Sequence, residues 1–188
     1  MLINNDTIVK DSDPKIRQKS KPVSLPLSKE DETLLRELFQ YVKDSTDPEL
    51  AEANNLRPAV GISAIQVGVP KQLTAVIVHE VDNEEKEITH EYMLVNPKIV
   101  SSSVQKAYLN SGEGCLSVQE EHEGHVVRSA RVTVKAFDLI QNKEITIRAR
   151  GYLAIVLQHE LDHFKGVLFY DHINPNNPFE EIEGALVI

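Results

Sequence analysis

The sequence predicts an α+β fold in a single domain, and three observations support this class. The strand-like segments form one series through the middle of the chain, with helices before and after it instead of alternating with it. A length of 188 residues fits one domain and is sufficient for an apolar core. No repeat, low-complexity tract or linker divides residues 1–188.

The N-terminal third should be an extended arm followed by helix. Residues 1–27 alternate polar stretches with prolines and predict an arm with one short helical turn before Lys21. Ser28 and Asp31 have the spacing of a capping box, so the first helix should run from there to about Ser45. A helical fragment is expected at 49–54 and a tight, buried turn region at 58–69.

From Gln72 the apolar pattern changes to that of strands. Gln141-Asn142 forms the turn of a hairpin, and Gly166 is placed to end a helix. The expected strands are 73–78, 91–97, 99–104, 126–139 and 144–149, followed by a helix at 151–165 and an edge strand at 185–188. These elements predict antiparallel or mixed β-sheets packed around a central helix.

Composition excludes several classes of protein. The formal net charge of -9 argues against broad binding of nucleic acid or of an anionic membrane surface, although a local basic patch remains compatible with it. No apolar run is long enough to span a bilayer, and the N-terminus lacks the layout of a signal peptide. The single cysteine cannot form an internal disulfide, so we expect a cytoplasmic location.

The strongest chemical signal is the pattern His159-Glu160-Leu161-Asp162-His163 within the predicted C-terminal helix. At about 100° per residue, His159 and His163 lie about 40° apart, and Glu160 lies about 60° from His163. Two imidazoles in this arrangement can bind one cation, and the carboxylate between them can reach a water on that cation. The alternative is a helix with two satisfied histidines and a solvated glutamate.

The surroundings of this helix favour a metal. Leu153, Leu157, Leu161 and Phe164 cover one side, and apolar residues also project from the side of the histidines, so the helix should be buried. Buried ionisable groups need strong partners, and a divalent cation is such a partner.

A catalytic metal usually takes three protein ligands, so one more is needed. Asp171, His172 and Glu180 follow the helix, but none has a persuasive context. Cys115 lies between Gly114 and Leu116 in a glycine-containing loop, and a thiolate on a divalent metal is stable. We therefore expect Cys115, His159 and His163 to bind one metal.

Three segments resemble, in order, the signature motifs of the peptide deformylases. They are Ala59-Val60-Gly61-Ile62-Ser63-Ala64-Ile65-Gln66, Glu113-Gly114-Cys115-Leu116-Ser117 and Gln158-His159-Glu160-Leu161-Asp162-His163. The first motif differs from the family pattern at Ala59, Ser63 and Ile65, where the family more often has Gly, Ala and Pro. The length, the segment before the first motif and the strand-like C-terminus resemble the longer, type 2 class of bacteria.

The resemblance implies removal of the N-formyl group from formyl-methionyl nascent polypeptides, with release of formate. Glu160 would take a proton from the attacking water and return it to the departing amine. The Gln66 amide and the Leu116 N–H would stabilise the oxyanion. The resemblance favours iron(II), with zinc, nickel or cobalt as substitutes. It also leaves room for a transient ribosome contact, and we expect a monomer that binds no membrane and no specific nucleic acid.

The methionine side chain requires an apolar slot, which we expect on the histidine side of the helix. The residues expected to bind substrate are Val60, Gly61, Gly112, Tyr152, Ile155 and Val156. Plain core packing is the alternative for the apolar members of this set. Asp162 should point elsewhere and pair with Arg128, which would orient the helix.

Two other interpretations of the sequence stay open. One is a zincin-type endopeptidase with Asp171, His172 or Glu180 as third ligand. The other is a metal-binding or structural module in which Glu160 only balances charge.

Overall fold

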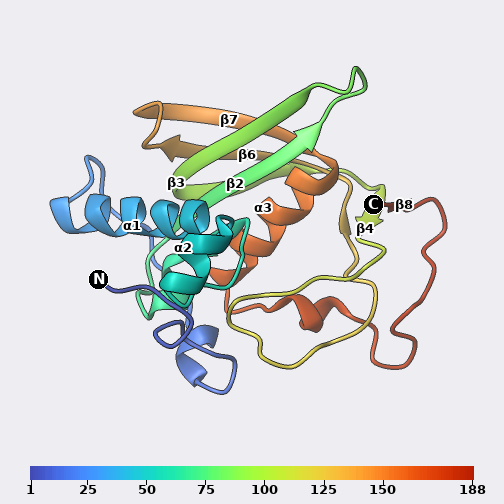
Figure 1. Cartoon of the computed structure of the whole chain (residues 1–188). Coiled ribbons are helices and arrows are strands. Elements are labelled where there is room, and N and C mark those ends of the chain that lie inside the picture. Colours follow the sequence, from blue (N-terminus) through green and yellow to red (C-terminus); the bar gives the residue numbers. More distant parts are fainter.

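Two β-sheets pack around helix α3 (Gly151–His163) in the computed structural model, which describes residues 1–188 (Figure 1). The larger sheet has the order β1-β2-β3-β6-β7, and all its neighbouring strands are antiparallel. Its strands are β1 (Gly61–Ser63), β2 (Leu73–Val81), β3 (Glu87–Ser102), β6 (Arg131–Asp138) and β7 (Lys143–Arg150). The smaller sheet has the order β5-β4-β8, with strands β5 (Arg128–Ser129), β4 (Lys106–Tyr108) and β8 (Leu186–Val187), and β8 runs parallel to β4. The predicted α+β class is confirmed.

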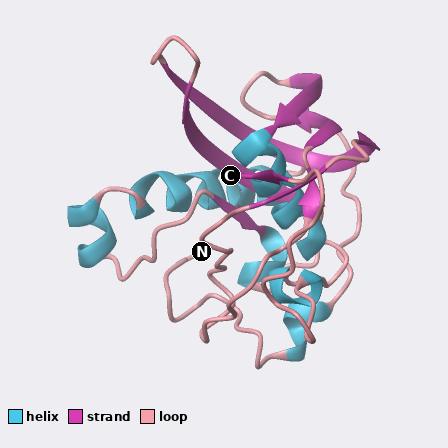
Figure 2. Ribbon diagram, turned by 90° about the vertical axis from the view of Figure 1, so that its right-hand side faces the viewer, coloured by secondary structure: helices cyan, strands magenta, loops and turns pink.

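The larger sheet has a helix on each face. Helix α1 (Lys29–Ser45) packs on the side of Leu73, Ala75 and Ile77 in one apolar cluster. Helix α3 packs on the other side, where Val76 and Val78 belong to a second cluster. The side chains of β2 alternate between these clusters because successive strand residues point to opposite faces. The far end of the β2–β3 hairpin projects beyond both helices (Figure 1 and Figure 2).

The predicted helices are present. The Ser28 hydroxyl accepts a hydrogen bond from the Asp31 N–H at 3.1 Å and caps α1. The short helix α2 (Pro48–Ala53) follows, and α3 ends before Gly166, whose φ of 72° is left-handed. In the N-terminal arm, the 3₁₀ turn η1 (Pro14–Arg17) is the short helical turn expected there, and Ile8 and Ile16 are buried. Two more 3₁₀ turns, η2 (Ala64–Val67) and η3 (Phe169–His172), lie next to the site.

Two predicted strand boundaries were wrong. The segments 91–97 and 99–104 belong to one long strand, β3, which contains two register shifts. Asn96, with a φ of 49°, lies within the first shift, and its side chain pairs with the backbone of Val23.

The segment 126–139 is not one strand. Its beginning pairs with β4 as β5, and the remainder enters the larger sheet as β6. The chain changes sheets at Ala130, whose N–H donates to the Gln105 carbonyl. Apolar alternation does not reveal such a change, because both halves bury the same face of the chain.

No helix combines the length and the apolar character needed to cross a membrane.

Candidate active site

Helix α3 directs His159, Glu160 and His163 into the space between the two sheets. Glu160 and His163 are buried, at 4% and 1% relative exposure. The helix is fixed to the smaller sheet by Gln158, whose side-chain amide exchanges two hydrogen bonds of 2.9 Å with the Ser129 backbone. On its opposite side, Leu153, Leu157, Leu161 and Phe164 join the apolar cluster under the larger sheet, as expected.

Cys115 meets both histidines. Its Sγ lies 3.5 Å from His163 Nε2, and one donor atom each from Cys115, His159 and His163 lie within 4.8 Å of one another. A tetrahedral cation about 2.3 Å from sulfur and about 2.0 Å from nitrogen holds the two donors about 3.5 Å apart. The three predicted ligands therefore fit one divalent metal.

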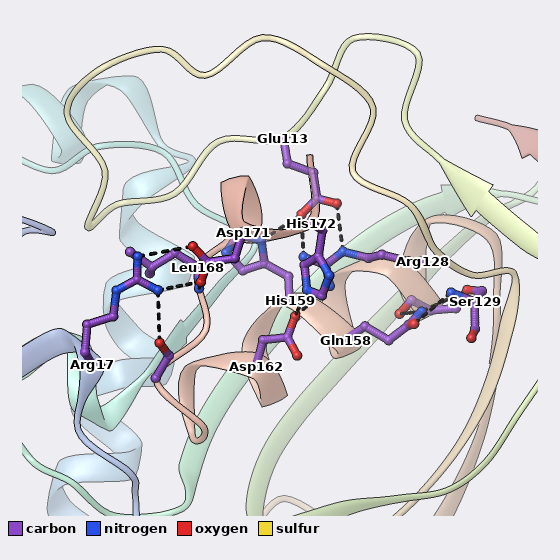
Figure 3. A network of polar contacts seen from close by, with 12 residues as sticks. Arg17, Glu113, Arg128, Ser129, Gln158, His159, Asp162, Leu168, Asp171 and His172 are labelled. Carbon is purple, nitrogen blue, oxygen red and sulfur yellow. Dashed lines mark hydrogen bonds and ion pairs between the residues drawn. The ribbon is translucent and has the colours of Figure 1, made fainter. Parts of the chain in front are cut away.

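A chain of buried charges supports the first histidine (Figure 3). His159 Nδ1 lies 2.9 Å from Glu113 Oε1, which leaves Nε2 free to face the thiol. Glu113 also accepts two hydrogen bonds from Arg128, at 2.8 and 3.0 Å. Arg128 in turn donates to Asp162 Oδ2 at 2.9 Å, so the predicted pairing of Asp162 with Arg128 is present. His172 contacts the same Asp162 oxygen at 2.7 Å.

The electrostatics of the site favour a thiolate. Burial acts to raise the pKa of Cys115, but His163 and His159 outweigh it and hold that pKa well below its usual value. Burial also opposes ionisation of Glu113, but His159 and Arg128 lower its pKa below the ordinary range. For Glu160 burial prevails, and its pKa is raised.

Glu160 extends from α3 towards β1. Its Oε2 lies 2.9 Å from the Ser63 hydroxyl, and its carboxyl group packs against Gly61. A side chain at position 61 would overlap Glu160, since a Cβ would stand 2.6 Å from Oε1. The first motif thus supplies both the space and a hydrogen bond for this carboxyl group.

Gln66 and Leu116 present N–H groups near the sulfur. Gln66 is buried, its Oε1 accepts from the Ser63 N–H at 2.9 Å, and its Nε2 lies 3.5 Å from Cys115 Sγ and 3.2 Å from Ser117 Oγ. The Leu116 N–H donates to no acceptor within the protein. Both residues line the cavity described next.

A cavity of about 640 Å³ opens onto these groups. Its wall includes Cys115, His159, Glu160 and all six residues expected to bind substrate: Val60, Gly61, Gly112, Tyr152, Ile155 and Val156. Ile155 is only 2% exposed and packs with Ala107 and Ala130, so it is largely a core residue behind the wall. Sequence reasoning missed other wall residues, among them Arg57, Leu109 and Ile188, because they come from loops and strand ends far apart in the chain.

The rival third ligands have other partners. Asp171 forms an ion pair with Arg17, His172 contacts Asp162, and Glu180 accepts from the Asn174 side chain at 2.8 Å. The structure brings none of them into the group of donor atoms that contains the two helix histidines.

A thiol and two imidazoles beside a buried carboxyl group that lines a cavity define the class of a metal-dependent hydrolase. A family model described as "Polypeptide deformylase" matches residues 5–179. The chain belongs to this family, whose members remove the N-formyl group from nascent polypeptides.

Relatives and solved structures agree with this membership. "Peptide deformylase 2" of Geobacillus stearothermophilus is 46% identical over 187 residues, covering 100% of this chain and 99% of the relative. "Peptide deformylase 2" of Bacillus subtilis (strain 168) is 47% identical over 187 residues, with the same coverage. The structure of the Ehrlichia chaffeensis peptide deformylase with actinonin matches with a TM-score of 0.70 and 30% identity, covering 95% of this chain and 92% of that one. A Met-Ala-Ser-bound peptide deformylase from Acinetobacter baumannii matches with a TM-score of 0.68 and 27% identity, covering 92% and 100%.

Glu113 and Ser63 are two polar residues of the site to which sequence reasoning assigned no role. A signal for Glu113 was available, because histidine ligands usually donate their second N–H to a carboxylate or carbonyl, and Glu113 lies two residues before Cys115. For Ser63 the only signal in the sequence was its departure from the family pattern. Its contact with Glu160 joins two residues that are 97 positions apart, so the sequence does not show it.

Proposed function

We propose that Cys115, His159 and His163 bind the metal of this deformylase and that Glu160 carries the proton during deformylation. The observation that supports this most strongly is the convergence of Cys115 Sγ and the two imidazoles next to Glu160, with Cys115, His159 and Glu160 in the wall of one cavity. A bound divalent cation would supply the Lewis acidity that makes water a nucleophile near neutral pH. Iron(II) is the proposed metal, and the same thiolate and imidazole donors suit zinc, nickel or cobalt.

Glu160 acts first as base and then as acid. It takes a proton from the water whose oxygen attacks the formyl carbon, and it gives that proton to the nitrogen when the C–N bond breaks. The products are formate and a polypeptide with a free amino terminus. The buried position of Glu160 beside Gly61 supports this role, because it places the carboxyl group at the wall of the cavity.

Two N–H donors stabilise the negative oxygen that forms during the attack. The Gln66 amide and the Leu116 N–H line the cavity next to Cys115, and each would contribute about 3 kcal/mol. Asp162 and Arg128, together with Glu113, hold the helix and the first histidine in place.

The formyl-methionine binds in the same cavity. Val60, Tyr152, Ile155 and Val156 offer apolar surface to the methionine side chain, and Gly61 and Gly112 offer backbone groups to the extended peptide. We propose that the protein is a monomer. It would act in the cytoplasm on polypeptides that leave the ribosome, through at most a transient ribosome contact.

The test compares two substrates and three proteins. Anaerobically prepared, iron-loaded protein should release formate from a formyl-methionyl peptide and react little with the same peptide acetylated. Glu160→Gln should keep metal and fold but lose turnover at least about hundredfold, since acid–base catalysis contributes roughly 10²–10⁴-fold. Glu144→Gln, at the exposed start of β7, is the matched control and should behave as the parent.

Cys115→Ser tests the metal ligands separately. It should lose most of the bound metal, measured by elemental analysis after gel filtration. Retained metal with retained formate release would contradict the ligand assignment, and cleavage of internal peptide bonds would contradict the proposed substrate.

A further inference from the structure

Ser63 is a buried polar residue that the mechanism above does not use. It lies at the end of β1 with 0% exposure. Its hydroxyl lies 2.9 Å from Glu160 Oε2, and no other side chain of the protein contacts that carboxyl group by a hydrogen bond. A buried hydroxyl beside the proton-carrying group needs an explanation.

The hydroxyl has one proton and three neighbouring acceptors. Two lie at 3.1 Å, the Glu160 carbonyl oxygen and Thr74 Oγ1, and the third is the closer Oε2. The Thr74 hydroxyl donates its own proton to the Ile62 carbonyl at 3.0 Å, so towards Ser63 it can only be an acceptor. Hydrogen bonds to a charged acceptor are shorter and stronger than those to a neutral one, so the Ser63 hydroxyl donates its hydrogen bond to Glu160 Oε2.

The other carboxyl oxygen faces a different environment. Oε1 lies over Gly61, where any side chain would displace it, and both residues belong to the cavity wall. The two oxygens are therefore not equivalent: Oε2 is bound to the Ser63 hydroxyl, and Oε1 lies next to Gly61 of the cavity wall.

We propose that Ser63 is a positioning residue for Glu160, fixing Oε2 so that Oε1 exchanges the proton with water and with the departing nitrogen. When Oε1 carries the proton, Oε2 is still an acceptor, so the Ser63 hydrogen bond persists through both steps. The orientation of the carboxyl group then need not be re-established between the base step and the acid step. This inference rests on the proposed role of Glu160.

The test is Ser63→Ala, with Thr74→Val as matched control. Alanine removes only the hydroxyl from this buried position, so the variant should fold. Its kcat for a formyl-methionyl peptide should fall about tenfold, a part of the acid–base contribution, while KM and metal content stay within about twofold of the parent. Thr74→Val removes a hydroxyl from the same buried network without removing the contact to Oε2, and its kcat should stay near that of the parent.

A crystal structure of Ser63→Ala provides a readout besides activity. The Glu160 carboxyl group should leave the orientation over Gly61 in at least part of the molecules. The proposal is overturned if kcat of Ser63→Ala stays within about twofold of the parent, if Thr74→Val loses as much kcat, or if the carboxyl group does not move. If Glu160→Gln also keeps its turnover, the proposed function has failed and not only the role of Ser63.

Discussion

At the scale of single residues, Glu113 connects the metal site to the rest of the charge network. One carboxyl group accepts from His159 and, through two bonds, from Arg128, and both of its partners are largely buried. A carboxylate behind a histidine ligand fixes the ring and increases its basicity. Through His159, Glu113 would therefore influence a metal bound at this site without being a ligand itself.

Replacing Glu113 by Gln should weaken metal binding while leaving all three ligands in place. We expect the metal affinity to fall roughly 10–100-fold, the usual effect of removing such a partner. Competition with a chelator of known affinity measures this, and Glu144→Gln again serves as control. An unchanged affinity would mean that His159 is held by its helix alone.

At the scale of elements, the end of α3 is held by the N-terminal arm. Gly166 has a left-handed φ of 72°, and a Cβ there would overlap the backbone of Arg17. The Arg17 side chain donates to the Gly166 carbonyl and pairs with Asp171 in η3 (Figure 3). The conformation of the turn after α3 thus depends on both the N-terminal arm and η3.

Gly166→Ala should therefore lower the free energy of unfolding by more than the backbone strain at a left-handed φ would account for. Gly184 is the matched control, because its φ of 73° is similar but the space around it is open. We expect Gly184→Ala to lower the free energy of unfolding by about 1 kcal/mol and Gly166→Ala to lower it by a further 1–3 kcal/mol or so, as for an overpacked site. Urea unfolding of both variants checks this. Equal losses of unfolding free energy would show that the N-terminal arm moves away from the new side chain at no cost.

The Arg17–Asp171 pair should make stability depend on pH. Burial acts to raise the pKa of Asp171, but hydrogen bonds from Arg17 and from the Leu168 N–H outweigh it, and the pKa is lowered. Its folded pKa then lies below the unfolded value of about 3.9, so the stabilisation is present above that value and is lost as the pH falls through the folded pKa.

Asp171→Asn should accordingly lower the free energy of unfolding at pH 7 by at most about 1 kcal/mol, since the pair is partly exposed. The difference from the parent should shrink as the pH falls below about 4 towards the folded pKa, because the carboxylate of the unfolded chain is protonated first. Denaturant unfolding at several pH values measures it. A difference that grows towards acid pH would contradict the assignment.

At the scale of the whole molecule, the sequence predicted those parts that depend on local spacing. The Ser28 cap, the Gln141-Asn142 hairpin and the i, i+4 histidines are determined within a few residues, and the structure has all three. The change of sheet at Ala130 and the contact of Ser63 with Glu160 depend on segments that meet only after folding. The apolar periodicity of the sequence does not show which distant segments contact one another. For this reason the two strand boundaries were wrong and Ser63 was given no role.

One sulfur and two imidazole nitrogens are proposed to bind the same cation. X-ray absorption at the metal edge of the loaded protein tests it most directly, because it counts ligands by element. We expect one sulfur at about 2.3 Å and two imidazole nitrogens at about 2.0–2.1 Å from the metal. If Cys115→Ser retains some metal, the spectrum of that metal should contain no sulfur shell. A shell of nitrogen and oxygen alone in the parent protein would contradict Cys115 as a ligand.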